Sequence, residues 1–169
     1  MKPLSRLGIL SIVLLVCVGA DQWTKVLAQQ YLRGRPVQSF LNDIARLQYS
    51  ENPGAFLSLG SGLSDSSRFW VLTVIVGLVL VGAVLYLILT PKLSKLSTHA
   101  LAWTVAGGVS NLLDRSFRTG GVVVDFMNLG VGPLRTGIFN IADMAIMAGV
   151  GLLILDLSHE KKEITTRAS

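Results

Sequence analysis

Phe139-Asn140-Ile-Ala-Asp143-Met-Ala-Ile146 opens the last apolar stretch of the chain, which runs from Ile138 to Leu157. A stretch of about twenty residues is long enough to cross the hydrocarbon core of a bilayer. Asp143 lies within its first two turns, although a carboxylate at membrane depth costs up to about 2.5–3.5 kcal/mol and such an acid usually has a function. The stretch therefore predicts a spanning helix that carries a functional carboxyl group near one end.

A second acid, Asp125, lies in the short apolar run Gly121-Val-Val-Val-Asp125-Phe126, eighteen residues before Asp143. This run is too short to span a membrane. We interpret the two acids as facing one another at a membrane surface. Two carboxyl groups at close range cannot both ionise easily, so such a pair shares a proton.

The composition defines the class of protein. Hydrophobic residues make up 51% of the chain, charged residues only 15%, and the mean hydropathy is +0.59. Soluble domains carry roughly a quarter charged residues, so the chain is predicted to be one integral membrane domain, residues 1–169. The net charge of +5 is gathered between apolar stretches, which suits anionic membrane lipids and not nucleic acid. The isolated Cys17, His99 and His159 predict no disulfide, no metal site and no cofactor.

Four apolar stretches, at about 7–28, 69–90, 97–113 and 138–157, predict an all-α membrane four-helix bundle. Residues 29–68 are polar and rich in turn residues, and they predict a small β-rich lobe lying on the membrane. Its expected strands are Leu47–Tyr49 and Ala55–Leu59. Residues 114–137 are expected to form a second outer connection.

Two features of the helices are informative. The first stretch begins like a cleavable signal peptide, with Lys2 and Arg6 before an apolar run. The apolar pattern continues to Ala28, however, and Asp21 and Lys25 have the spacing of a helical pair, so we favour an uncleaved span. In the third stretch, Ala102, Ala106 and Ser110 recur at four-residue spacing, which lets a neighbouring helix approach closely.

Basic residues predict the orientation. Four spans place both termini on one side of the membrane. That side holds a dense set of basic residues: Lys2, Arg6, Lys92, Lys95, Lys161, Lys162 and Arg167. Cytoplasmic segments are rich in Lys and Arg, so both termini are expected in the cytoplasm and both acids at the outer face.

Paired carboxyl groups can activate water, one as a base and its protonated partner as an acid. Asn140 has the position of a helix cap, which puts Asp143 at the positive end of the helix dipole. We therefore expect Asp143 to ionise more easily and Asp125, in an apolar segment, to be protonated more easily. Two other readings stay open: an ordinary helix-start residue with a solvated loop acid, or a small proton-coupled transporter that uses an intramembrane Asp.

Five segments together resemble the lipoprotein signal peptidase (signal peptidase II) family. They are Asp21-Gln-Trp-Thr-Lys25, Tyr49-Ser-Glu-Asn52-Pro-Gly54-Ala55-Phe56, Gly107-Gly-Val-Ser-Asn111-Leu-Leu-Asp114-Arg115, Gly121-Val-Val-Val-Asp125-Phe126 and Phe139-Asn140-Ile-Ala142-Asp143-Met-Ala145-Ile146. Each segment alone is a weak indication, but the five occur in the family's order and cover most of the chain.

The resemblance implies an aspartyl endopeptidase of the bacterial inner membrane. Its partner would be a prolipoprotein signal peptide, cut just before a diacylglyceryl-modified cysteine, in contact with membrane lipids. The catalytic pair would be Asp125 and Asp143. The implied substrate-binding residues are Asn52, Gly54, Asn111, Arg115 and Asn140, and the implied supporting residues are Asp21, Lys25 and Asp114. A purely structural role for Asp21 and Asp114, as partners of Lys25 and Arg115, remains an alternative.

The chain also departs from the family pattern. Pro53 precedes Gly54, a single Ala55 precedes Phe56, and Ser110 stands where a glycine is common. Met144 replaces a small residue after Asp143. Neither acid is lost, so activity is expected, but Met144 is predicted to crowd the site and to alter the range of substrates.

Overall fold

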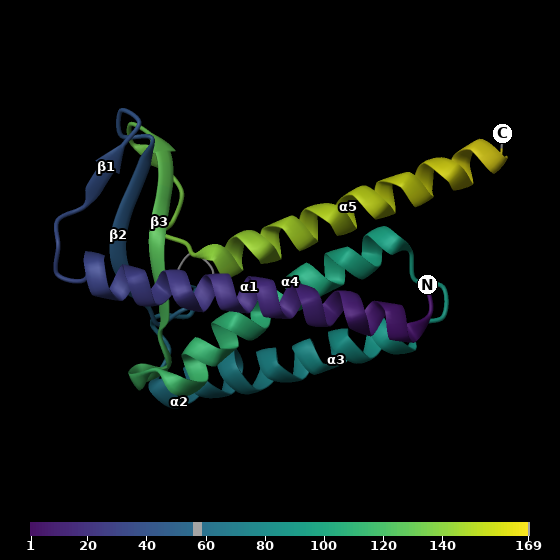
Figure 1. Cartoon of the computed structure of the whole chain (residues 1–169), viewed down its shortest axis with the longest axis horizontal. Coiled ribbons are helices and arrows are strands. Elements are labelled where there is room, and N and C mark those ends of the chain that lie inside the picture. Colours follow the sequence, from purple (N-terminus) through teal and green to yellow (C-terminus); the bar gives the residue numbers. More distant parts are fainter. Residues whose placement is uncertain (56–58, 169) are drawn as a thin grey trace.

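The computed structural model describes residues 1–55 and 59–168. Long helices lie side by side, and a small sheet crosses one of their ends (Figure 1). The helices are α1 (Pro3–Leu32), α2 (Asp65–Arg68), α3 (Val76–Leu89), α4 (Lys95–Phe117) and α5 (Ile141–Ala168), with a π-helical segment (Phe69–Ile75) between α2 and α3 and a 3-10 turn at Thr119–Gly121. The strands are β1 (Gln38–Phe40), β2 (Ala45–Asn52), β3 (Val123–Val131) and β4 (Leu134–Arg135).

Within the described residues, three helical segments are long and apolar enough to cross a membrane: Pro3–Leu32, Asp65–Leu89 and Ile141–His159. They correspond to the predicted stretches 7–28, 69–90 and 138–157. The stretch at 97–113 lies inside α4, which packs against α1, α3 and α5. Because other helices surround α4 on several sides, it tolerates more polar residues than a helix that faces lipid.

Helices α4 and α5 approach closely because glycines stand at their contact. A Cβ atom on Gly107 would lie 2.3 Å from the carbonyl oxygen of Ala142. A Cβ atom on Gly149 would lie 2.2 Å from Thr104 Oγ1 and 2.6 Å from the carbonyl oxygen of Ala100. Neither distance is possible for a real side chain, so both positions require glycine for this helix spacing.

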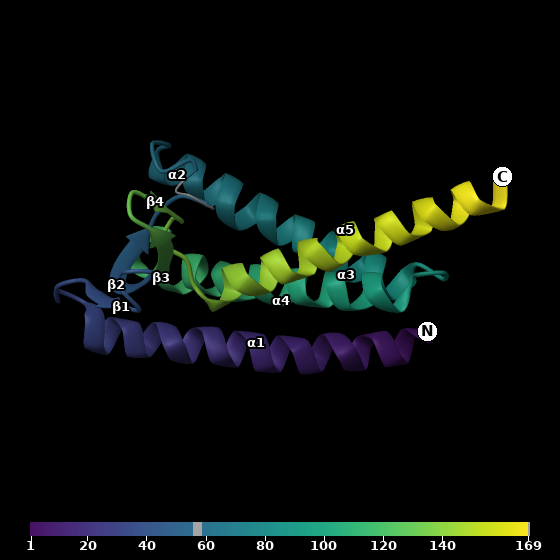
Figure 2. The same cartoon turned by 90° about the horizontal axis from the view of Figure 1, so that it is seen from above.

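Helix α1 packs against the predicted row of small residues on α4. Ala102, Ala106 and Ser110 are each fully buried. Ala106 packs with Cys17 of α1, and Ser110 donates a hydrogen bond of 2.7 Å to Asp21 Oδ2 of the same helix. Figure 2, the view rotated by 90°, shows α1 and α4 running alongside one another.

The sheet is antiparallel throughout, with strand order β1-β2-β3-β4. Its central pair places Ser50 of β2 opposite Asp125 of β3, and Asn52 opposite Val123. One part of the sheet packs on the end of α1. The buried apolar residues of this contact are Ala28, Leu32, Val124 and Phe126.

The strands of the lobe come from different residues than the sequence analysis predicted. Strands β3 and β4 come from 114–137, which was expected to be a connection, and β2 extends the predicted strand Leu47–Tyr49 in both directions. An apolar run without alternation, such as the one before Asp125, is typical of a strand buried on both faces. Ala55 and Leu59, the ends of the other predicted strand, lie in a bend and a turn, and residues 56–58 between them lie outside the described residues.

Replacing Gly149 by Ala should destabilise the protein by about 1–3 kcal/mol, because the new methyl group overlaps backbone and side-chain atoms of α4. Thermal unfolding in detergent micelles would measure the loss. Gly151→Ala is the matched control, since a Cβ there meets nothing within 4 Å and Ala favours a helix over Gly. Equal melting temperatures for the two variants would contradict the close α4–α5 contact.

Candidate active site

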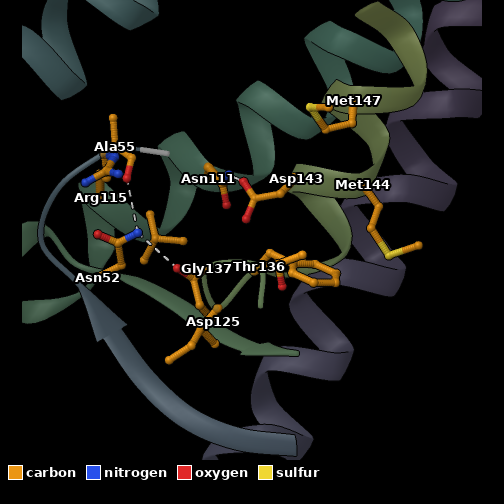
Figure 3. A pocket seen from close by; sticks show the side chains of 13 residues that line it. Asn52, Ala55, Asn111, Arg115, Asp125, Thr136, Gly137, Asp143, Met144 and Met147 are labelled. Carbon is orange, nitrogen blue, oxygen red and sulfur yellow. Dashed lines mark hydrogen bonds between the residues drawn. The ribbon is translucent and has the colours of Figure 1, made fainter. Parts of the chain in front are cut away.

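A cavity of about 330 Å³ lies where the sheet meets the helices, and both Asp125 and Asp143 line it. Figure 3 shows Asp125 reaching it from β3 and Asp143 from the start of α5. The other polar side chains on its wall are Asn52, Asn111, Arg115 and Thr136. The structure thus brings together two acids and several donors from four separate elements, β2, β3, α4 and α5.

Asp125 is 3% exposed and is held by two amide groups. Asn140 Nδ2 donates to its Oδ1 at 2.7 Å, and Asn52 Nδ2 donates to its Oδ2 at 3.0 Å. The β2–β3 pairing determines the second contact, because it carries Asn52 to the strand end beside Asp125. Each carboxyl oxygen therefore has a donor and a fixed direction.

Asp143 and Asn140 bond reciprocally at the start of α5. Asn140 Oδ1 accepts the Asp143 backbone N–H at 2.9 Å, and Asp143 Oδ2 accepts the Asn140 backbone N–H at 3.1 Å. This is a capping box, which satisfies two backbone donors that the helix start would otherwise leave free. Asn140 is a cap, as its position predicted, and the same side chain also reaches Asp125.

Asn111 of α4 connects Asp143 to a buried cation. Its Nδ2 donates to Asp143 Oδ1 at 3.0 Å, while its Oδ1 accepts from Lys25 Nζ at 2.9 Å. An ammonium group only donates hydrogen bonds, so it must face the amide oxygen of Asn111. The amide nitrogen is thereby turned toward Asp143.

Lys25 is fully buried, and two carboxylates surround it. Its Nζ lies 2.7 Å from Asp21 Oδ2 and 3.0 Å from Asp114 Oδ2. Asp21 Oδ1 also accepts the backbone N–H of Ala142 at 2.9 Å, and Asp114 Oδ2 accepts that of Val124 at 3.2 Å. Each supporting acid thus holds the backbone of the residue next to one of the cavity acids.

Arg115 binds the chain itself in this structure. Its guanidinium donates to the carbonyl oxygens of Gly54 and Gly121. The alternative that Asp114 pairs with Arg115 is wrong, because Asp114 Oδ1 accepts from Arg118 Nε at 3.0 Å instead. Gly54 is fixed from its other side as well, since its N–H donates to Asn52 Oδ1 at 2.9 Å.

Burial has a direct effect on Asp125. Removal from water raises the pKa of this carboxyl from 3.8 to about 6, and the nearby charge of Asp143 acts in the same direction. The hydrogen bonds from Asn52 and Asn140 oppose the shift only in part. Asp125 therefore holds a proton at a pH where an exposed carboxyl group does not.

Some residues of the site were not identified from the sequence. Met147, Thr136 and Gly137 line the cavity, and Met147 could have been found because it follows Asp143 at helical spacing. Met144 does line the cavity, with half of its surface exposed. No group of three or more His, Cys, Asp or Glu side chains is placed to hold a metal ion among the residues described.

A second hollow of about 230 Å³ adjoins the first and shares Asn111, Arg115 and Asp143 with it. Its remaining wall is apolar and comes from the π-helical segment, α3, α4 and α5. The apolar side chains on it are Leu72, Val76, Leu112, Ile146 and Met147. The polar cavity thus continues into an apolar one between helices.

Comparisons with known proteins show the family and the fold of the chain. A family model described as signal peptidase (SPase) II matches residues 13–159. The chain belongs to the signal peptidase II family. It is 32% identical over 152 residues to a lipoprotein signal peptidase of Halalkalibacterium halodurans, covering 90% of this chain and 93% of the relative. A lipoprotein signal peptidase of Brevibacillus brevis is also 32% identical, over 148 residues, with 88% and 93% covered.

Two solved structures, both described as bacterial membrane enzymes, share the fold of this signal peptidase II chain. One superposes with a TM-score of 0.79 at 24% identity and covers 92% of this chain and 91% of its own. The other has a TM-score of 0.73 at 26% identity, with 89% and 92% covered. Together with the three apolar helical segments, this makes the chain a multi-pass membrane protein and, by family, a protease.

Substituting Lys25 by Met in this signal peptidase II chain should cost about 3–5 kcal/mol of stability, because Asp21 and Asp114 would stay buried without their cation. Arg33→Met is the control. Arg33 pairs with Glu51 at 3.4 Å but is 58% exposed, so its loss should cost at most about 1 kcal/mol. Unfolding midpoints in micelles would compare the two, and equal losses would contradict the role of the buried cluster.

The raised pKa of Asp125 predicts how stability depends on pH. The folded state binds a proton between pH 3.8 and about 6 that the unfolded state releases, so the contribution of Asp125 to stability falls as the pH rises through this window. Asp125→Asn removes that contribution. The free energy of unfolding of the natural protein minus that of the variant should decrease from pH 4 toward pH 7, and an increase would contradict the raised pKa.

Proposed function

We propose that the chain is an aspartyl endopeptidase that removes signal peptides from prolipoproteins, cutting just before a diacylglyceryl-modified cysteine. The family supplies the class of substrate, since curated relatives are named lipoprotein signal peptidases. The observation that carries the proposal is the shared cavity. Asp125 and Asp143 line the same hollow, and each is held in place by amide groups.

The two acids divide the work as base and acid. Asp143, which accepts the Asn140 backbone N–H at the positive end of α5, is the base that takes a proton from water. Asp125, whose pKa is raised to about 6, carries the proton that is given to the substrate carbonyl oxygen. The water oxygen bonds to the carbonyl carbon and gives a tetrahedral diol. The C–N bond then breaks, the leaving amine takes the proton that Asp143 accepted, and one hydroxyl of the diol returns its proton to Asp125 as the new carboxyl group forms.

The surroundings of the two acids suit an unwound peptide. A signal peptide in a bilayer is helical, and cutting it requires that backbone groups be freed and given new partners. Asn52, Asn111 and Arg115 on the cavity wall provide donors for these groups. The adjoining apolar hollow suits the apolar part of the signal peptide, while acyl chains remain in the lipid.

The proposal includes a position in the cell. The chain would reside in the bacterial inner membrane with spans at about 7–28, 69–90, 97–113 and 138–157. Both termini would be cytoplasmic, and the lobe and both acids would lie at the periplasmic face. The dense basic residues of the terminal side support this orientation.

Substitution of each acid tests the proposal. Asp125→Asn and Asp143→Asn should each lower the rate of cleavage of a lipidated precursor by at least about 100-fold, because each removes one proton-transfer group. The measurement is the shift in precursor size after incubation with enzyme in lipid nanodiscs. Asp156→Asn is the control, since this acid of α5 is partly exposed, accepts a hydrogen bond from Ser94 and lies thirteen residues after Asp143 along the helix.

The same variants separate the alternatives. A proton-coupled transporter would require Asp143 alone. Two results together would support the transporter: the natural protein does not cleave the precursor, and the Asp125→Asn variant takes up protons normally. Full cleavage by either single variant, with normal insertion in the membrane, would contradict the proposed catalytic pair.

A further inference from the structure

Exposed apolar side chains gather at one end of the sheet, where the β1–β2 and β3–β4 turns meet. We refer to this end as the lobe tip. Its members and exposed fractions are Phe40 (47%), Leu41 (74%), Ile44 (46%), Leu129 (45%), Val131 (72%) and Leu134 (82%). Turns that face water are normally built from small and polar residues. Exposed apolar side chains gathered at one end of a sheet mark a site of interaction.

The first of the two turns is built at an energetic cost. Leu41, Asn42 and Asp43 have φ values of 54°, 51° and 69°, all in the left-handed region. A residue with a side chain is disfavoured in that region, Leu more than Asn or Asp, and such strain persists only where the surroundings enforce it. In this turn the side chain of Leu41 is displayed to the outside, with 74% of its surface exposed.

Polar contacts enforce the strained turn. Asp43 accepts hydrogen bonds from Ser39 Oγ at 2.7 Å and from the guanidinium of Arg46. Its backbone carbonyl oxygen accepts a hydrogen bond from Arg135 Nη1 at 2.7 Å. Since Arg135 belongs to β4, this bond also locks the first turn to the second.

The two turns form one rigid unit. Arg135 Nε donates to Asn128 Oδ1 at 2.6 Å, and the Gly130 N–H donates to the Ile44 carbonyl oxygen at 2.9 Å. A Cβ on Gly130 would lie 2.5 Å from the Leu134 carbonyl oxygen, so the backbones are as close as they can be. The apolar side chains of both turns therefore keep their relative positions.

The direction of the strands determines what the tip can meet. In Figure 1 the strands β2 and β3 run across the axes of α1 and α5, and the tip projects sideways past the start of α5. Because these helices cross the membrane, a direction across them lies in the plane of the bilayer. The tip thus overhangs the lipid around the helices and not the helices themselves.

The charges at the tip suit the same partner. Arg46 and Arg135 flank the apolar side chains, and the nearby carboxylate, Asp43, balances only one of them. Arginine beside apolar residues is a pattern that binds anionic headgroups while the apolar side chains enter the acyl boundary.

We propose that the lobe tip inserts into the lipid interface and anchors the sheet to the bilayer surface. The strands that end in this tip also carry Asn52 and Asp125, so the anchor sets the height of that edge of the cavity above the membrane. The proposal depends on membrane insertion of the helices and is independent of the reaction that the site performs.

A fluorescent reporter at the tip tests the anchor. Leu41→Cys, made in a Cys17→Ser background, would be labelled with an environment-sensitive dye and placed in nanodiscs of phosphatidylethanolamine and phosphatidylglycerol. Cys17 is 3% exposed, and its removal ensures a single site. Lipids with a nitroxide near the headgroup should quench the label at least about twofold more than they quench a label at Gln38→Cys, an exposed position on β1 that lies three residues before Leu41 and is outside the tip. Aqueous iodide should show the opposite preference.

A second reporter, Leu134→Cys, repeats the measurement from the other turn and covers the case in which the first variant folds poorly. Lipid quenching at both positions would support insertion. Iodide quenching of the tip labels equal to that of Gln38→Cys would overturn the proposal. Labels shielded from both quenchers would also overturn it, because the tip would then be covered by protein, such as a second copy of the chain.

Discussion

The ammonium group of Lys25 is the interaction on which the site depends. It is fully buried in a membrane protein, where an uncompensated charge would be very costly, and two carboxylates offset that cost. Its third partner is the amide oxygen of Asn111. Because an ammonium group cannot accept a hydrogen bond, this contact determines which end of the amide faces Asp143. A charge on the first helix thus controls the donor offered to an acid on the last.

The two carboxylates beside Lys25 extend this control to the backbone. Asp21 accepts the N–H of Ala142, the residue before Asp143, and Asp114 accepts the N–H of Val124, the residue before Asp125. The backbone next to each cavity acid is therefore held by a buried carboxylate, and both of these carboxylates pair with Lys25. The catalytic proposal requires two acids at a fixed separation, and this cluster joins the helix and the strand that carry them.

Local patterns in the sequence were sufficient for most helices and for several contacts. The stretch before Pro91 predicted a span, and the spacing of Asp21 and Lys25 predicted their pairing. The strand that carries Asp125 was missed because its pairing partner, β2, lies about seventy residues earlier, and only three-dimensional pairing distinguishes a buried strand from an apolar connection. The link from Lys25 to Asn111 was missed for a similar reason, since it joins residues eighty-six positions apart.

The central place of α4 has a consequence for how the protein is made. Among the residues described, α4 is not one of the segments that are apolar enough to cross a membrane. It also carries Asp114 near its C-terminal end. Transfer into lipid on its own would expose that acid before Lys25 could reach it. An α1 that is already in place would offer Lys25 to α4 as it enters the membrane, and α5 would then cover the glycine face of α4. The order of the helices along the chain, in which α4 emerges after α1 and α3, allows this sequence of events during synthesis.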